Sequence, residues 1–64
     1  MTEVDCVMGT ILFSYSTPVA ARMIDGKLIK TSKKWSKTTT RHINKWLDGA
    51  IAQEVEQSDL DFLI

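Results

Sequence analysis

The apolar residues near the start of the chain recur with a period of two. Residues 10–16, TILFSYS, alternate so that Ile11, Phe13 and Tyr15 lie on one side of an extended chain and the residues between them on the other. This alternation is typical of a half-buried strand. Pro18 interrupts it, because proline has no amide hydrogen to donate and suits a strand start or an edge.

Two further strand-like segments, residues 19–24 and 27–31, flank Asp25-Gly26. Asp-Gly is a strong hairpin signal, because both central residues of a type I′ turn need a positive φ. A two-residue turn at this position pairs Met23 with Leu28. This register places four side chains on one face of the hairpin, those of Val19, Ala21, Met23 and Leu28.

The period then changes to that of a helix. Three threonines, residues 38–40, offer side-chain oxygens to cap the first free amides of a helix. The apolar positions that follow have the three-and-four spacing of one helical stripe, and they are Ile43, Trp46, Leu47, Ala50, Ile51 and Val55. Glycine inside a helix costs about 1 kcal/mol relative to alanine. We therefore expect a helix from about Thr39 to Gln57, either continuous or bent at Asp48-Gly49.

These patterns predict an α+β fold in which a small antiparallel β-sheet of three or four strands, with its hairpin at Asp25-Gly26, carries a C-terminal amphipathic helix on one face. Residues 1–9 are less regular, although their alternation is compatible with a short first strand. We expect a single domain, residues 1–64, with a folded unit over residues 10–57 and an acidic, apolar C-terminal tail over residues 58–64.

The small size of the chain limits how it is stabilised. A core in a domain of 64 residues rarely supplies more than about 3–5 kcal/mol, and small domains usually add disulfides, a metal or a partner subunit. Cys6 and His42 are the only cysteine and histidine, so they form neither an internal disulfide nor a four-ligand zinc site. We expect no metal, no cofactor and a homo-oligomer.

The sequence also predicts a cytoplasmic location. No segment approaches the roughly 18 apolar residues of a membrane span, and residues 1–5, MTEVD, are acidic where a signal peptide is basic. A single cysteine in a chain without disulfides agrees with a reducing compartment. No membrane association is expected.

Catalysis is not indicated. The chain has no glycine-rich phosphate loop and no combination of nucleophile, base and orienting group. His42, near Thr38 and Asp48, could be drawn as part of a triad, but a histidine at a helix start or on a helix surface is the simpler interpretation. We expect a binding protein and no enzyme.

The charge distribution changes this picture most. The net charge is zero, yet seven of the eight basic residues fall within positions 27–45. They are Lys27, Lys30, Lys33, Lys34, Lys37, Arg41 and Lys45. The acidic residues lie mostly towards the two ends of the chain. Such asymmetry carries more functional information than the neutral total.

We interpret this block as a surface for nucleic acid or another polyanion. Lysines and hydroxyls precede a helix whose free N-terminal amides favour anions, and phosphate contacts are built from these groups. Trp35 can stack on a base or cover a lysine. The candidate binding residues are Lys30, Lys33, Lys34, Trp35, Lys37, Thr38, Thr39, Arg41, His42 and Lys45. The alternative is a solvated connection, with Trp35 and Trp46 in the core.

The C-terminus offers a second candidate site. Gln57, Leu60 and Phe62 are similar to the QxxLxF peptides by which bacterial replication proteins dock on the sliding clamp, and Leu60, Phe62 and Leu63 resemble the clamp-binding tails of proteins from large tailed phages. An acidic, apolar peptide suits a hydrophobic pocket in basic surroundings. The alternative is that Leu60, Phe62, Leu63 and Ile64 pack on the open side of the sheet or on a second subunit.

Residues 13–47 carry a longer resemblance, to a family of short uncharacterised proteins from tailed phages and some bacteria. The shared pattern is aromatic-Tyr-x-Thr-Pro-Val-Ala, then Gly-Lys, then Ser-x-Thr-Thr-x-(Arg/Lys)-His-(Ile/Leu)-Asn. It occurs here as Phe13, Tyr15, Thr17, Pro18, Val19, Ala20, Gly26, Lys27, Ser36, Thr38, Thr39, Arg41, His42, Ile43 and Asn44. The resemblance implies a phage origin and a small accessory role, hence the cytoplasm of the host cell. Residues 1–9 and the acidic tail lie outside it.

Two functions therefore remain open. The first is a small phage-type accessory protein that binds nucleic acid or another polyanion through the basic surface. The second is a protein adaptor or host-takeover inhibitor that docks through Gln57 to Ile64 on a host or phage protein, with a sliding clamp as one candidate.

Overall fold

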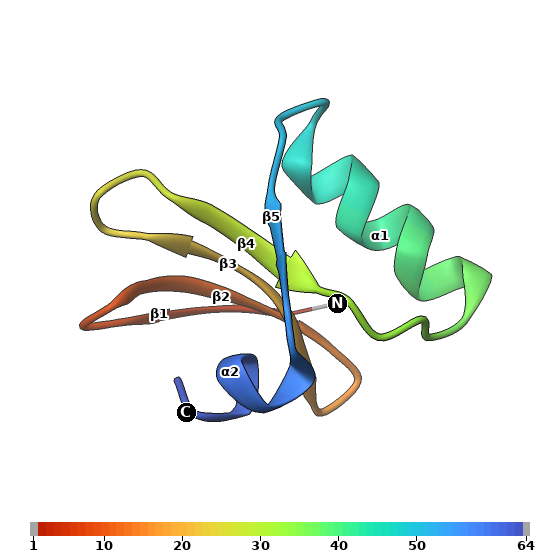
Figure 1. Cartoon of the computed structure of the whole chain (residues 1–64), viewed down its shortest axis with the longest axis horizontal. Coiled ribbons are helices and arrows are strands. Elements are labelled where there is room, and N and C mark those ends of the chain that lie inside the picture. Colours follow the sequence, from red (N-terminus) through yellow and green to blue (C-terminus); the bar gives the residue numbers. More distant parts are fainter. Residues whose placement is uncertain (1, 64) are drawn as a thin grey trace.

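The structure is a computed structural model that describes residues 2–63 of the chain. Ile64, which the sequence analysis includes in the tail, lies outside the described residues. The elements follow the order β1 (Thr2–Cys6), β2 (Gly9–Ser14), β3 (Thr17–Met23), β4 (Leu28–Thr31), α1 (Lys37–Leu47), β5 (Gln53–Val55) and α2 (Gln57–Asp61) (Figure 1). The predicted α+β fold is confirmed.

The sheet has five strands in the order β1-β2-β3-β4-β5, more than the three or four predicted. β1 to β4 form antiparallel pairs, whereas β5 runs parallel to β4 and places Glu54 beside Lys30. A parallel pair needs a crossover connection of a dozen or more residues, and α1 supplies it. Strands and helices therefore extend from Thr2 to Asp61, beyond the folded unit predicted for residues 10–57.

The long helix predicted to reach Gln57 is wrong beyond Leu47. Asp48 has a left-handed backbone, with φ 51°, and its amide donates to the carbonyls of Asn44 and Lys45. Gly49 follows with φ 82°. Two successive residues with positive φ end the helix, as is common at helix C-termini. The apolar stripe that continues past this point is not helical, and Ile51 is 95% exposed.

The β3–β4 hairpin forms at Asp25-Gly26, but its register differs from the prediction by one residue. Leu28 pairs with Arg22 instead of Met23. The loop has three residues, because the amide of Gly26 donates to the carbonyl of Met23 at 2.9 Å and Gly26 itself has φ 91°. A three-residue loop that ends in a left-handed glycine is a common hairpin connection. The change moves Leu28 to the opposite face of the sheet, because side chains alternate along a strand.

A β-bulge in β3 moves a second residue. Leu12 pairs with Ala20 and Phe13 with Pro18, so Val19 is an extra residue in β3. Val19 and Ala20 consequently both pack on the α1 side of the sheet. The predicted shared face is correct for Ala21 and Met23 and wrong for Val19 and Leu28.

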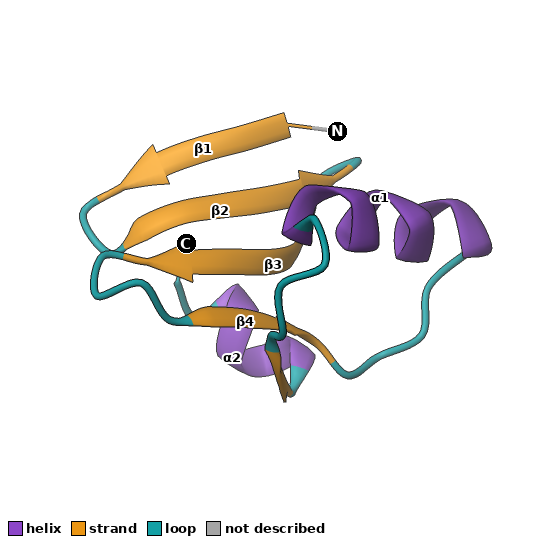
Figure 2. Ribbon diagram, turned by 90° about the horizontal axis from the view of Figure 1, so that it is seen from above, coloured by secondary structure: helices purple, strands orange, loops and turns teal. Residues whose placement is uncertain are grey.

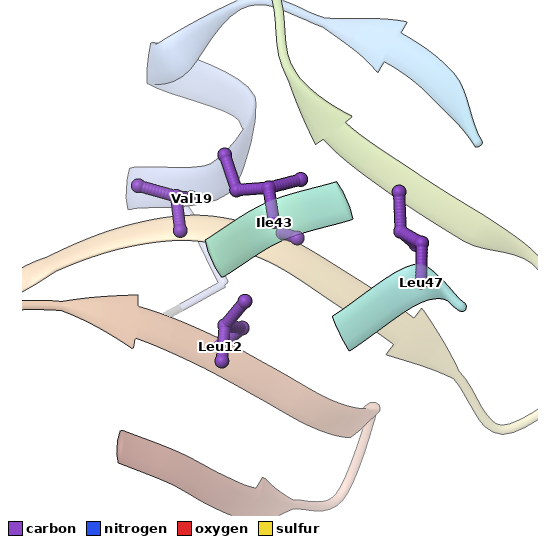
Figure 3. Close-up of a cluster of buried hydrophobic side chains, with 5 residues drawn as sticks. Leu12, Val19, Ile43 and Leu47 are labelled. Carbon is purple, nitrogen blue, oxygen red and sulfur yellow. The ribbon is translucent and has the colours of Figure 1, made fainter. Parts of the chain in front are cut away.

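Each face of the sheet has its own core and its own helix. On one face, the α1 cluster consists of Leu12, Val19, Ala20, Ile43 and Leu47 (Figure 3). On the other, the α2 cluster consists of Ile11, Ala21, Ile29 and Leu60. Figure 2 shows α1 in front of the sheet and α2 behind it. The predicted single helix-covered face is therefore incomplete, and β2 is buried on both sides, with Ile11 4% and Leu12 1% exposed.

Candidate functional site

A groove of about 660 Å³ lies between α1 and the β4–β5 edge of the sheet. We call it the basic groove, and it is lined by Lys30, Thr31, Ser32, Lys33, Lys34, Trp35, Lys37, Thr40, Arg41, Ile43, Asn44 and Glu54. Its volume falls within the roughly 300–1,000 Å³ of typical ligand sites.

Four segments bring these side chains together, one of which is β5 with Glu54. β4 contributes Lys30, which pairs with Ala20 and so faces the α1 side of the sheet. The connection between β4 and α1 contributes Ser32, Lys33, Lys34 and Trp35. α1 contributes Lys37 and Arg41, which lie four positions apart and therefore on one face of the helix.

The groove is strongly positive although the chain is neutral. Its lining has five basic side chains, Lys30, Lys33, Lys34, Lys37 and Arg41, and a single acidic one, that of Glu54. Glu54 is the direct neighbour of Lys30 in the parallel β4–β5 pair. Its negative charge therefore offsets mainly the positive charge of Lys30. The other four cations, Lys33, Lys34, Lys37 and Arg41, have no second acidic side chain beside them among the described residues that line the groove.

Trp35 stands among these cations and is 37% exposed. The ammonium nitrogen of Lys33 lies 4.3 Å from the centroid of its ring, which is a cation–π contact. Its indole N–H donates to the side-chain oxygen of Gln57 at 3.3 Å. The hydrogen bond to Gln57 thus fixes the orientation of the Trp35 ring, and the ring remains partly accessible to solvent.

Gln57 holds this arrangement together. Its side-chain oxygen also accepts from the hydroxyl of Thr31 at 2.8 Å, and its amide group donates to the carbonyl of Pro18 at 2.7 Å and to the carboxylate of Asp61 at 3.2 Å. The QxxLxF pattern predicts Gln57 to be part of a docking peptide and gives no sign of this positioning role. No local signal could reveal it, because three of its four partners lie 22 to 39 positions away in the chain.

The N-cap residue of α1 is Ser36, and not one of the threonines at residues 38–40. The hydroxyl of Ser36 accepts from the amide of Thr39 at 3.1 Å. The Thr39 side chain is only 4% exposed and shares a hydrogen bond of 3.0 Å with the hydroxyl of Ser14. Thr39 therefore has a structural role, and its buried side chain does not line the basic groove.

We expect Ser36→Ala to lower the free energy of unfolding by about 1 kcal/mol, because the amide of Thr39 loses its capping oxygen. Thr38→Ala is the matched control, since Thr38 is exposed and alanine favours the helix. Urea unfolding followed by circular dichroism measures both values. Equal stability of the two variants would remove Ser36 as the cap.

The structure brings six of the ten predicted binding residues into the basic groove: Lys30, Lys33, Lys34, Trp35, Lys37 and Arg41. Thr38, His42 and Lys45 lie on α1 but do not line it. Thr38 and Lys45 are exposed, and His42 is half-buried. Sequence reasoning missed the contribution of Asn44 and Thr40, which follow the helical face of Arg41, and that of Glu54, which arrives through β5.

The second tryptophan has a structural role. Trp46 is half-buried against the α1 cluster, and its indole N–H donates to the carboxylate of Glu3 on β1. The guanidinium carbon of Arg22 on β3 lies 5.4 Å from the centroid of its ring. Trp46 therefore ties the end of α1 to two strands, in agreement with its predicted place at the core.

The predicted C-terminal tail is partly built into the fold. The boundary expected between residues 57 and 58 falls inside α2, where Leu60 is fully buried in the α2 cluster. Leu63 is half-buried against the same cluster, whereas Phe62 is 89% exposed. Gln57 and Leu60 would have to leave these sites before a partner could bind them. The packing of Leu60 on its own sheet is the alternative that the structure adopts.

Among residues 2–63, no group of three or more His, Cys, Asp or Glu side chains is placed to hold a metal ion. Within the same residues, no helix has the length and apolar character needed to cross a membrane.

A profile described as "Family of unknown function (DUF8033)" matches residues 2–62. It covers the N-terminal strand and α2, both of which lie outside the resemblance seen in the sequence. Neither the curated proteins nor the solved structures give a significant match.

Proposed function

The chain belongs to the family of unknown function DUF8033, and we propose from its own geometry that it is a small accessory protein that binds nucleic acid through the basic groove. One observation carries this proposal: a neutral chain gathers five cations and one acid around a partly exposed tryptophan. The phage origin is proposed from the resemblance of residues 13–47 alone. The free, exposed thiol of Cys6 supports a cytoplasmic location.

The chemistry of the groove suits phosphate groups. Ammonium and guanidinium groups from the β4–α1 connection and from α1 line the same groove, and the exposed residues Ser32 and Thr40 add hydroxyl groups to its lining. Phosphates are bound by such donors without regard to base sequence. The α1 cluster forms the base on which these side chains are placed, since Ile43 belongs both to that cluster and to the groove lining.

We expect binding to depend steeply on salt. Four cations are not opposed by Glu54, and each phosphate contact releases a counterion. The logarithm of the affinity should therefore fall with the logarithm of the salt concentration with a slope of about −3 for a single strand. Alanine at Lys33, Lys34, Lys37 and Arg41 together should abolish the complex.

Fluorescence anisotropy with a labelled oligonucleotide at low and moderate salt measures this effect. Lys27→Ala is the control, because Lys27 is an exposed lysine outside the groove, and it should bind like the wild type. Circular dichroism verifies that the fourfold variant is folded. The absence of a wild-type complex at low salt, or unchanged binding by the folded fourfold variant, contradicts the proposal.

The alternative is docking through the C-terminus on a protein such as a sliding clamp. One observation favours it: the large apolar side chain of Phe62 is 89% exposed. The other two residues of the QxxLxF pattern, Gln57 and Leu60, are engaged inside the fold. Loss of clamp capture in a pull-down with Phe62→Ala would support this function, and no capture by the wild type would remove it.

A further inference from the structure

The turn between β2 and β3 presents an aromatic side chain on an unfavourable backbone. Tyr15 has φ 59°, a left-handed conformation that glycine and asparagine adopt readily and bulky residues rarely do. Its side chain is 88% exposed, so little packing offsets this conformation. Strained residues of this kind occur preferentially at functional sites.

Tyr15 lies next to the basic groove in space. A small hollow of about 110 Å³ is lined by Ser14, Tyr15, Thr17, Val19, Trp35 and Thr39. Trp35 belongs to the lining of both cavities, so the hollow adjoins the groove across the indole ring. Two aromatic rings that are 20 positions apart in sequence thus flank one opening at the end of a cationic groove.

The hollow of about 110 Å³ is small beside the groove of about 660 Å³, and it leaves space for a small group next to Trp35 and Tyr15. The hydrogen bond from Trp35 to Gln57 fixes one of the two rings before any ligand arrives. Such preorganisation lowers the entropic cost of binding.

We infer that the ligand of the basic groove is single-stranded nucleic acid, with its phosphates on the groove cations and its bases stacked on Trp35 and Tyr15. This inference rests on the function proposed above. A positive groove combined with exposed aromatic rings is how proteins hold single strands. Paired bases are stacked inside a duplex and do not present their faces to such rings. Duplex DNA would therefore be bound only through its phosphates and the cations of the groove.

Three probes separate stacking from charge: oligo(dT) of about ten nucleotides, an abasic oligomer of the same length and charge, and a duplex of the same length. At one salt concentration, the wild type should bind oligo(dT) more tightly than the other two. Tyr15→Asn should weaken binding of oligo(dT) by about fivefold or more and leave binding of the abasic oligomer unchanged. Asparagine suits the left-handed backbone, so this variant should remain folded.

Two control variants complete the experiment. Tyr15→Phe keeps a ring and should bind oligo(dT) like the wild type. Ile24→Ala removes a side chain that is 79% exposed in the β3–β4 loop, at the other end of β3, and should also have no effect. In a Trp46→Phe background, oligo(dT) should quench the fluorescence of Trp35, and the abasic oligomer should quench it much less.

The outcomes are distinguishable. If none of the three probes binds, the proposed function itself fails. If the groove cations are needed but the abasic oligomer binds as tightly as oligo(dT), or the duplex binds more tightly, the groove recognises charge alone and the inference is overturned. Equal affinities of wild type and Tyr15→Asn for oligo(dT) would also overturn it.

Discussion

Gly9→Ala should unfold the protein or leave it only marginally folded. Gly9 has φ 138°, and a Cβ atom placed on it would lie 2.0 Å from the carbonyl oxygen of Arg22 and 2.9 Å from the Cα of Met23. Both are backbone atoms of β3, which pairs with Gly9 across the sheet. Relief of the clash would require β2 and β3 to separate.

The expected loss can be compared with the stability available. Backbone strain costs about 1–3 kcal/mol, and overpacking costs about 1–3 kcal/mol. The combined loss of roughly 2–6 kcal/mol approaches or exceeds the roughly 3–5 kcal/mol that a core of this size supplies. Circular dichroism with urea unfolding measures the outcome.

Gly26→Ala is the matched control for this substitution. Gly26 also has a positive φ, of 91°, but no atom lies within 4 Å of the position that its Cβ would occupy. Only conformational strain remains, with a cost of about 1 kcal/mol. A Gly9→Ala variant with the same urea midpoint as Gly26→Ala would show that the close approach of β2 and β3 is not required.

Leu60→Ala should be the second most damaging of these substitutions. Leu60 is fully buried and contacts the sheet within the α2 cluster, with Ile11, Ala21 and Ile29. Truncation of a buried leucine to alanine costs about 2–5 kcal/mol, because the transfer energy is lost and a cavity remains. We expect a large fall in the urea midpoint.

The control for Leu60→Ala lies two residues further along the chain. Phe62 is 89% exposed, and Phe62→Ala should change the free energy of unfolding by no more than about 0.5 kcal/mol. The pair also tests whether residues 58–64 form a tail. If Leu60→Ala leaves the stability unchanged, α2 is a detachable peptide, and docking on a protein partner becomes the better-supported function.

Deletion of the residues after Glu56 should also destabilise the fold. It removes Leu60 and also Gln57, with its hydrogen bonds to Thr31, Trp35 and the Pro18 carbonyl. A loss of partner binding by such a shortened chain would therefore report unfolding as well as the loss of a docking peptide. Phe62→Ala in the full chain is the cleaner test of the tail.

Much of the candidate site was accessible from sequence because its residues are neighbours in the chain. Five of the six predicted residues that line the groove fall between Lys33 and Arg41, within one connection and the first turns of α1. The residues from Lys37 to Arg41 lie within about one turn of α1, which keeps them close together in space. Lys30 follows because β4 leads directly into the same connection.

The rest of the site depends on residues that are distant in sequence. Tyr15, Gln57 and Glu54 reach the groove or its margin through the β2–β3 turn, α2 and β5. Nothing in their immediate neighbourhoods indicates this placement. The exposed Tyr15 became informative only when its backbone conformation and its position beside Trp35 were known.

The sequence by itself determined the α+β class, the strands near residues 10 and 20, the hairpin at Asp25-Gly26, a helix beginning at about Thr39, two residues after its actual start at Lys37, and the basic character of residues 27–45. These features arise from interactions within a few residues, such as side-chain alternation, turn conformation and helical spacing. Local patterns are enough to specify them.

Only the tertiary structure decided the hairpin register, the bulge at Val19, the end of α1 and the change of residues 53–55 from helical stripe to strand. The register and the bulge depend on which residues pair across neighbouring strands, and side-chain alternation alone allows more than one pairing. Residues 53–55 form a strand because they pair with β4, and Leu60 is buried by residues on the opposite face of the sheet. The partners of β5 and Leu60 lie about 25 to 50 positions away, where a local pattern does not reach.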